Sequence, residues 1–324
     1  MRIITSLGAP RPLSRTAEDA AAPAREPVRV ALVQHHWRGD ADSTAAELAD
    51  GIAAAAAQGA RFVALPELSL MRYPADTLPE GDAAAAAEDL ADGPTARFAA
   101  EQARRHGIFV HASMFRRDAV GDSLGTNTAV LMAPDGTRVG ATDKLHIPVT
   151  EGYYEDHYFR AAQPDEPYPV HEPSELGMRV GLPTCWDEWF PELARLYSLA
   201  GADLLVYPTA IGSEPGFPDF DTEPLWRQVI VGNAIANGLF MMVPNRWGDE
   251  GTLTFYGSSF ICDPYGRVLV RAPRDESAVL VADVDLDQRR DWLQLFPFLR
   301  TRRPETYGAL VEPVNADDAL GQAR

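Results

Sequence analysis

The sequence predicts a single α/β domain with mixed sheets, and three observations lead to this prediction. Short apolar stretches rich in Val, Ile and Leu recur along the 324-residue chain, most of them bounded by Gly, Pro or Asp. Alanine-rich or amphipathic stretches of helical length separate many of them. A turn sequence, "PDG" at 134–136, joins another pair directly. Alternating strands and helices build a covered parallel sheet, and hairpins add antiparallel strands to it.

Strands and helices alternate in the first half of the chain. Residues 28–34, "VRVALVQ", are rich in valine and predict the first strand. Residues 43–60 predict a helix, with Ser43 as its N-cap and Gly59 as its end. The elements predicted next are strands at 61–67 and 108–117, a helix within 83–107, and a hairpin over 127–146.

The same two kinds of element recur in the second half. Pro191 stands at the first position of a predicted helix, 191–202, and Glu192 lies in its first turn, where an acid suits the helix dipole. A second helix is predicted at 225–238. Strands are predicted at 178–185, 203–210, 239–245, 256–270 and 277–286.

The chain is predicted to fold as one domain, residues 28–310, because no internal repeat and no linker divides it. Residues 1–27 lack an apolar signal core and carry acidic residues, so we expect a disordered tail there. A transit peptide is the weaker interpretation of that segment. Residues 311–324 are expected to form a second tail.

The composition argues against several classes of protein. The formal net charge is −18, and no block of Lys and Arg offers a nucleic-acid surface. No apolar run is long enough to span a membrane. Two cysteines make no disulfide framework, and the seven histidines lack the spacing of zinc ligands. We therefore expect a cytoplasmic protein that binds a small molecule, with no metal, nucleic-acid or membrane partner.

Three predicted strands each end near a residue that can do chemistry: Glu67, Lys144 and Cys185. Loops converge at strand ends in open α/β sheets, and sites gather there. A carboxylate can take the thiol proton, and an ammonium can stabilise a thiolate or an oxyanion. The three residues together would form a complete catalytic unit, although the acids that follow Cys185 in the sequence disfavour a thiolate.

Each of these residues also has an ordinary interpretation. A cysteine at the end of an apolar strand is more often part of the core than a nucleophile. Glu67 follows a proline and could cap a helix, and Lys144 could be a solvated surface side chain. Cys262 lies within "SSFICDPYG" and is predicted to be core. Three histidines lack an identifiable Ser or Asp partner pattern: His111, His146 and His157.

Three stretches, in their order and at their intervals, resemble the nitrilase superfamily of carbon–nitrogen hydrolases. They are "ALPELSL" (64–70), "DKLHIP" (143–148) and "CWDEWFPE" (185–192). The resemblance runs from about Val28 to about Tyr307 and includes "YPTAIG", "NAIANGLF" and "FYGSSFICDPYGRVL". "CWDEWFPE" and "GYYEDHYF" (152–159) are most similar to N-carbamoylputrescine amidases. β-Ureidopropionases and N-carbamoyl amino acid hydrolases are more distant relatives.

The resemblance implies a four-layer αββα sandwich whose protomers pair sandwich to sandwich into a homodimer or a larger assembly. It implies a Glu–Lys–Cys triad, with Glu67, Lys144 and Cys185 in those roles, and it needs no metal or organic cofactor. The family also has a second glutamate after the lysine. Glu155 matches its place, with Glu151 as a competitor and a solvated loop acid as the ordinary interpretation. A carboxylate there would keep the lysine charged and oriented.

In the implied mechanism, Cys185 attacks a carbonyl carbon while Glu67 accepts the thiol proton. Lys144 and the backbone N–H of Trp186 stabilise the oxyanion. Ammonia leaves, and water cleaves the resulting thioester. We expect an N-carbamoyl amine as the substrate, N-carbamoylputrescine first, giving the amine, CO2 and ammonia. The alternative is a hydrolase of another small amide or nitrile, and a more distant one is a catalytically silent scaffold.

Four residues are predicted to contact the substrate: Tyr153, Asp187, Glu188 and Trp189. Relatives that hydrolyse carbamoylated amino acids carry arginine two or three residues after the cysteine, where this chain has acids. Acids favour a neutral or cationic substrate over a carboxylate. Glu188 could instead pair with Arg195 or face solvent. The segment 212–224 adds further acids: Glu214, Asp219, Asp221 and Glu223.

Three positions and one loop depart from the family's pattern. Pro183 and Thr184 interrupt the aliphatic strand before Cys185, and Pro removes a ladder donor, so we expect that strand to end in a bend or bulge. Asn233 stands where many relatives carry histidine, and the loop 212–224 is particular to this chain. These departures leave the chemistry intact and the exact substrate open.

Overall fold

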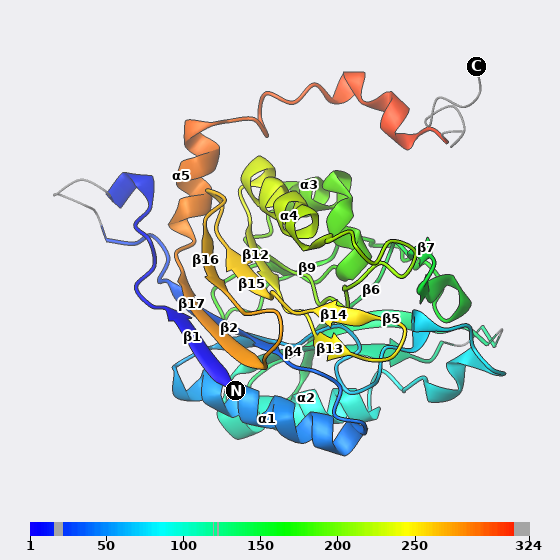
Figure 1. The fold of residues 1–324 in the computed structure, drawn as a ribbon. Helices are drawn as coiled ribbons and strands as arrows, with labels where there is room; N and C mark the ends of the chain where they lie inside the picture. The colour runs from blue at the N-terminus through cyan, green and yellow to red at the C-terminus, as the bar shows by residue number, and fades with distance from the viewer. Residues whose placement is uncertain (16–21, 119, 122, 314–324) are drawn as a thin grey trace.

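The computed structural model describes residues 1–15, 22–118, 120–121 and 123–313. Two large β-sheets pack face to face, and helices cover the outer face of each (Figure 1). This arrangement is the predicted four-layer αββα sandwich. Both sheets contain parallel and antiparallel strand pairs, as predicted.

The larger sheet has seven strands in the order β1-β17-β2-β3-β4-β5-β6. Its middle strands β2, β3 and β4 run parallel, because helices α1 and α2 carry the chain back between them. The β5–β6 hairpin extends one edge with antiparallel strands. The seven strands are β1 (Arg2–Ser6), β2 (Val28–Gln34), β3 (Phe62–Ala64), β4 (Phe109–Arg116), β5 (Thr126–Met132), β6 (Arg138–Asp143) and β17 (Ala278–Val284).

The second sheet has six strands in the order β16-β15-β12-β11-β10-β9, with β10, β11 and β12 parallel. Its strands are β9 (Val170–His171), β10 (Val180–Gly181), β11 (Leu204–Val206), β12 (Phe240–Val243), β15 (Phe260–Cys262) and β16 (Val268–Arg271). Two small hairpins complete the β-structure: β7 (Val149–Thr150) with β8 (Tyr153–Tyr154), and β13 (Trp247–Asp249) with β14 (Thr254–Tyr256).

The helices begin and end where the sequence has caps and breakers. Asp40, rather than the predicted Ser43, caps α1, because its carboxylate accepts the N–H of Ser43. Gly107 and Gly238 end α2 and α4 in the left-handed conformation that glycine adopts without strain. The helices are α1 (Ala41–Ala57), α2 (Pro94–His106), α3 (Pro191–Leu199), α4 (Glu223–Asn237) and α5 (Asp287–Leu295).

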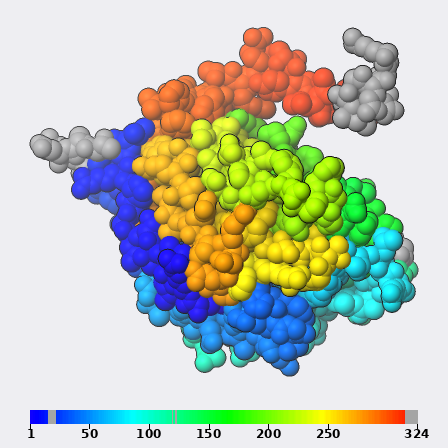
Figure 2. Space-filling model, in the orientation of Figure 1, coloured from blue at the N-terminus to red at the C-terminus, as the bar shows by residue number. Residues whose placement is uncertain are grey.

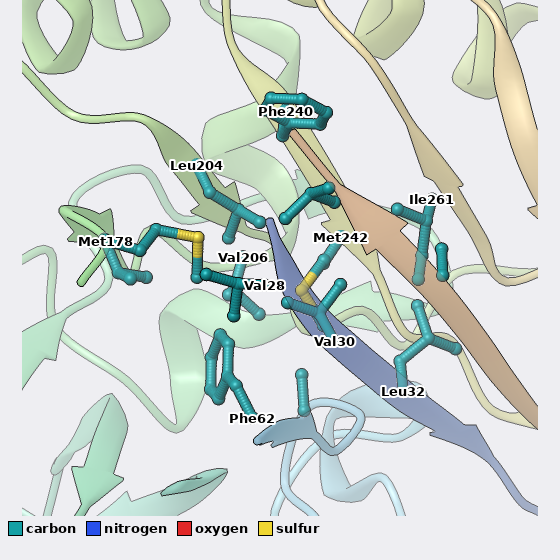
Figure 3. Packing of buried hydrophobic residues seen from close by; sticks show 14 of the residues in the cluster. Val28, Val30, Leu32, Phe62, Met178, Leu204, Val206, Phe240, Met242 and Ile261 are labelled. Atoms are coloured by element: carbon teal, nitrogen blue, oxygen red, sulfur yellow. The ribbon is translucent and has the colours of Figure 1, made fainter. Parts of the chain in front are cut away.

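The core lies in three layers between these elements. Side chains of both sheets interdigitate in the middle, including Val30, Phe62, Leu204 and Met242 (Figure 3). A second cluster joins the larger sheet to α1 and α2, and a third joins the smaller sheet to α3 and α4. Fully burying one large aliphatic side chain contributes roughly 1.5–3 kcal/mol, so these layers hold the strand ends in fixed positions.

The structure differs from the predictions at the N-terminus, at one helix and at one strand. The tail predicted at 1–27 is wrong for residues 2–6, which form strand β1 beside β17. Helix α5 was not predicted. Of the tail predicted at 311–324, residues 314–324 lie outside the described residues. The strand predicted at 178–185 has its ladder only at Val180 and Gly181, so it stops before Pro183, as that proline leads one to expect.

Candidate active site

Strand ends of the two large sheets and of one small hairpin bring four predicted residues together. Glu67 follows β3, Lys144 follows β6 and Glu155 follows β8, while Cys185 lies beyond β10 in the second sheet. Their side chains are buried, with at most 6 % of each residue exposed. We call Glu67, Lys144, Glu155 and Cys185 the buried cluster.

Lys144 lies between two carboxylates. Its Nζ donates to Oε1 of Glu67 at 2.9 Å and to Oε2 of Glu155 at 2.6 Å. Burial alone would lower the pKa of Lys144, but the two carboxylates raise that pKa well above its ordinary value. Lys144 is therefore a permanent ammonium inside the protein.

Glu67 has one carboxylate oxygen with hydrogen-bond donors and one without. Asn127 Nδ2 donates to the same Oε1 that Lys144 contacts, at 2.6 Å. The other oxygen, Oε2, is buried and has no hydrogen-bond partner among the described residues. A buried carboxylate oxygen without a donor is suited to accept a proton from a neighbouring thiol.

Glu155 is bound on both oxygens, one by Lys144 and the other by Tyr73, whose hydroxyl donates to Oε1 at 2.8 Å. Burial raises the pKa of Glu155 to about 7, against the opposing effect of Lys144. The structure places Glu155 in this cluster, whereas Glu151 is exposed to solvent.

Cys185 opens a short 3₁₀ turn, Cys185–Trp189, in a strained backbone conformation. Its φ is +42°, a region that costs a residue other than glycine on the order of 1–3 kcal/mol. The Cys185 N–H donates to the backbone oxygen of Pro208 at 3.0 Å, which ties the turn to the end of β11. Backbone N–H groups in the first turn of a helix lack intrahelical acceptors, and Trp186 lies there.

The thiol of Cys185 is protonated at rest. Burial raises its pKa well above the ordinary value, Glu67 raises it further, and Lys144 opposes both. With two carboxylates and one ammonium, the other three groups carry a net negative charge when ionised. A thiolate at Cys185 therefore needs a base that takes its proton as it reacts.

A cavity of about 220 Å³ leads to Cys185. Its volume lies below the usual range for drug-sized ligands, so it suits a small substrate. No Arg, Lys or His occurs among its described lining residues. They are Pro148, Thr150, Tyr153, Glu155, Cys185, Trp186, Trp189, Ala210, Ile211, Glu214 and Thr222. Among the described residues, no group of three or more His, Cys, Asp and Glu side chains could hold a metal ion.

Comparison with known proteins assigns the chain to a family. A sequence model of the carbon–nitrogen hydrolase family matches residues 29–294. The chain belongs to the carbon–nitrogen hydrolase family. This confirms the resemblance to the nitrilase superfamily, and it makes the protein a hydrolase that acts on amide-type carbon–nitrogen bonds.

Relatives of this carbon–nitrogen hydrolase include a citrullinase and an N-carbamoylputrescine amidase. It is 36% identical to a citrullinase of Francisella tularensis over 88% of the chain and 98% of the relative. It is 33% identical to an N-carbamoylputrescine amidase of Arabidopsis thaliana over 89% of the chain and 96% of the relative. A solved carbon–nitrogen hydrolase from Helicobacter pylori has the same fold, with a TM-score of 0.79 and 29% identity over 89% and 99% of the two chains.

Asp187 does not contact the cavity of the hydrolase, contrary to the prediction. Its Oδ2 accepts the N–H of Thr184 at 3.0 Å, and its Oδ1 accepts the N–H of His146 at 3.0 Å. The ring Nδ1 of His146 lies 2.7 Å from the same Oδ1, so His146 does have an aspartate partner. Asp187 therefore joins the turn that carries Cys185 to the loop that carries Lys144.

Glu188 is also directed away from the cavity. Its Oε1 accepts the indole N–H of Trp226 at 2.7 Å, and it pairs with neither Arg195 nor solvent. Burial raises the pKa of Glu188 well above its ordinary value, which favours the protonated carboxyl. Asn233 Nδ2 donates to the backbone oxygen of Glu188 at 3.0 Å, which is how the departure at Asn233 contributes to the site.

Of the acids in the loop 212–224, Glu214 lines the cavity. Asp221 is paired with Arg274, and Glu223 with Arg227. Asp219 is exposed. The predicted substrate contacts Tyr153 and Trp189 do line the cavity, together with Trp186.

Two site residues were missed by the sequence analysis. Asn127 has a detectable signal, because it is a polar residue inside a fully buried strand. Tyr73 has none, since it lies in an irregular loop and its contact with Glu155 joins residues far apart in the sequence. Cys262 is fully buried in β15 within the apolar cluster under α3 and α4, as predicted for a core thiol.

Proposed function

We propose that this enzyme hydrolyses the terminal ureido group of a small N-carbamoyl amine, with Cys185 as the nucleophile and Glu67 as the base. The observation that carries the proposal is the buried cluster, in which Lys144 is bonded to both carboxylates and one oxygen of Glu67 is free. Transfer of the thiol proton to Glu67 moves a negative charge within the cluster and creates no additional buried charge. The reaction therefore avoids the desolvation cost that opposes a resting thiolate.

The proposed reaction has two halves. The sulfur of Cys185 attacks the carbonyl carbon of R–NH–CO–NH2, and Lys144 with the N–H of Trp186 stabilises the oxyanion. Glu67 returns the proton to the leaving nitrogen, so ammonia departs and a thioester, Cys185–S–CO–NH–R, remains. Water, deprotonated by Glu67, cleaves the thioester. The resulting carbamate, R–NH–COOH, decomposes to the amine and CO2.

The cavity favours a substrate with a positive distal end. Glu214 is the acid at the partly exposed end of the lining, and Trp186 and Trp189 present aromatic rings beside it. Carboxylates and aromatic faces both attract ammonium groups. N-Carbamoylputrescine, which has a ureido group at one end and an ammonium at the other, is the first candidate.

Citrulline is the second candidate, because the citrullinase of Francisella tularensis is 36% identical. Citrulline carries the same ureido group and adds a carboxylate beside its ammonium. The described lining residues include no cation to bind that carboxylate. The structure therefore favours the carbamoyl amine over the carbamoyl amino acid.

Ammonia release across a panel of compounds tests the proposal. The panel contains N-carbamoylputrescine, citrulline, N-carbamoyl-β-alanine, an ω-amide and a nitrile. We expect the highest kcat/KM for N-carbamoylputrescine. A clear preference for N-carbamoyl-β-alanine or for the nitrile would refute the assignment of the substrate class.

We also propose that the protein assembles as a homo-oligomer through the outer side of α3 and α4. A groove of about 660 Å³ runs there between the helices and the C-terminal segment, which reaches away from the body of the molecule (Figure 2). Large apolar side chains are exposed around it, including Leu196, Leu199, Leu310 and Val311. Light scattering after gel filtration measures the mass, and a monomer would contradict this proposal.

A reducing compartment such as the cytoplasm suits the enzyme, because the mechanism needs a free Cys185 thiol.

A further inference from the structure

Arg246 is a fully buried arginine whose side chain is hydrogen-bonded to the loop that carries Glu67. Its Nη2 donates to the backbone oxygens of Glu67, Leu68 and Met71 at 2.9, 3.1 and 3.1 Å. Its Nη1 donates to both carboxylate oxygens of Glu250, at 2.8 and 2.9 Å. One guanidinium thus connects the loop after β3 to the segment between β12 and β14.

Glu250 extends this connection to the other side of Lys144. Its Oε2 accepts the backbone N–H of Tyr73 at 2.9 Å. The hydroxyl of Tyr73 in turn donates to Glu155. The Arg246–Glu250 ion pair therefore holds both carboxylates that contact Lys144, Glu67 through its carbonyl and Glu155 through Tyr73.

The loop needs this support because its backbone is strained where it carries the base. Leu68 has a φ of +48°, a conformation that leucine rarely adopts. The carbonyls of Glu67 and Leu68 flank the Cα atom of Leu68, and both accept hydrogen bonds from the same nitrogen of Arg246. These bonds fix the direction in which the Glu67 side chain leaves the backbone.

We propose that Arg246 and Glu250 are positioning residues that set where Glu67 and Glu155 lie around Lys144. Neither lines the substrate cavity, so their effect reaches the reaction through these two carboxylates. This role rests on the proposed function, in which Glu67 takes the proton of Cys185. Arginine is required because its planar guanidinium donates hydrogen bonds to three carbonyls and a carboxylate at once. A lysine ammonium, with three donors on one atom, cannot reach all of these acceptors.

Arg289 offers a matched control. It is a largely buried arginine whose guanidinium donates to three backbone oxygens, those of Ser198, Asn237 and Gly238, each at 2.9 Å. It joins α3 and α4 to α5 and contacts none of the buried cluster. Arg289→Lys removes a comparable set of bonds at a place where only stability should change.

The experiment compares Arg246→Lys, Glu250→Gln and Arg289→Lys, each in a Cys262→Ser background. Near-ultraviolet circular dichroism and the thermal unfolding midpoint check the fold. The rate at which iodoacetamide labels Cys185, followed from about pH 6 to about pH 9, reports how readily the thiol loses its proton, and it needs no substrate. Steady-state ammonia release gives kcat and KM.

We expect Arg246→Lys and Glu250→Gln to slow the labelling at neutral pH by about tenfold or more and to change its pH profile, because Glu67 is then out of place to take the thiol proton. In both, kcat should fall by about 10²-fold, the usual consequence of displacing a catalytic group by an ångström, while KM stays within about twofold. Arg289→Lys should lower the unfolding midpoint and leave the labelling profile unchanged.

Three outcomes separate the possibilities. Folded Arg246→Lys and Glu250→Gln variants with a wild-type labelling profile would overturn the positioning role. If Arg246→Lys does not fold, Glu250→Gln decides, because glutamine keeps one acceptor oxygen for Arg246 while it removes the charge and the second acceptor. If the labelling profile shifts as expected but no compound of the panel releases ammonia, the positioning role stands and the proposed function falls.

Discussion

The buried cluster and the mouth of the cavity differ in how their charges are held. Each charged side chain of the buried cluster has at most 1 % exposure and is hydrogen-bonded to another polar side chain. The mouth, which we define as the exposed or partly exposed lining residues Thr150, Trp186, Trp189, Glu214 and Thr222, carries one carboxylate. The charges of the buried cluster are thus held in fixed contacts away from solvent, whereas the carboxylate at the mouth is partly open to it.

The two regions should respond differently to mutation. In the buried cluster every group depends on a neighbour, so a substitution leaves an unpaired buried charge or removes a reacting group. At the mouth, Glu214 is half-buried and held by a long contact from Thr222 Oγ1 at 3.4 Å. Substitution there should change selectivity and leave the chemistry intact.

The largest effect is expected from Cys185→Ser. A serine hydroxyl is far less acidic than a thiol, so ammonia release should fall by roughly 10⁴-fold or more while the fold is kept. Cys262→Ser is the control, because that thiol lies in the apolar core of β15. Comparable activity losses in both variants would contradict the assignment of the nucleophile.

Glu155→Gln should lower kcat by about 10²-fold, the scale for losing a positioned group in a buried site. Glutamine keeps the shape of Glu155 and removes the charge that orients Lys144. Glu151→Gln is the matched control, since Glu151 is exposed on the same hairpin. If the control is the damaging change, the fourth residue of the site has been misplaced.

The pH profile gives a second test of Glu155. Burial raises its pKa to about 7, so the carboxylate is ionised above that pH and protonated below it. We expect kcat of the wild type to rise through about pH 7, and we expect this rise to be missing in Glu155→Gln. If kcat of the variant rises with pH in the same way as kcat of the wild type, a group other than Glu155 causes that rise.

A smaller effect is expected at the mouth. Glu214→Gln should reduce the preference for N-carbamoylputrescine over N-carbamoyl-β-alanine roughly three- to tenfold, because an ion pair at a half-buried site is worth on the order of 1 kcal/mol. The ratio of the two kcat/KM values measures it. Asp219→Asn, on the exposed part of the same loop, should leave the ratio unchanged. Equal ratios in wild type and Glu214→Gln would show that Glu214 does not contribute to substrate recognition.

The smallest effect is expected from Glu188→Gln, although Glu188 lies only three residues from the nucleophile. A protonated carboxyl and an amide both offer one acceptor and at least one donor, and glutamine can still accept from Trp226. We expect activity within about threefold of wild type and an unfolding free energy within about 1 kcal/mol. A strong loss of activity in a folded variant would show that Glu188 works as a carboxylate.

The sequence alone sufficed for the fold class, for nearly all of the major elements and for selecting Glu67, Lys144 and Cys185 as candidates, which the structure brings together. Periodicity is a local property, so β2, α1, β4, α3 and β17 could be located from their own residues. The three reactive residues stand in motifs whose order and spacing are themselves sequence features. Strand β1 was missed because it is short and partly exposed, and its place depends on pairing with β17 at the other end of the chain.

Only the tertiary structure decided which polar groups meet. Asp187 and Glu188 are adjacent in the sequence, yet one binds His146 and Thr184 and the other binds Trp226. The contacts of Arg246 with Glu67 and of Tyr73 with Glu155 join residues 179 and 82 positions apart. No local pattern encodes such contacts. They exist because two packed sheets bring separate strand ends together, and burial then favours a partner for most of the polar groups there.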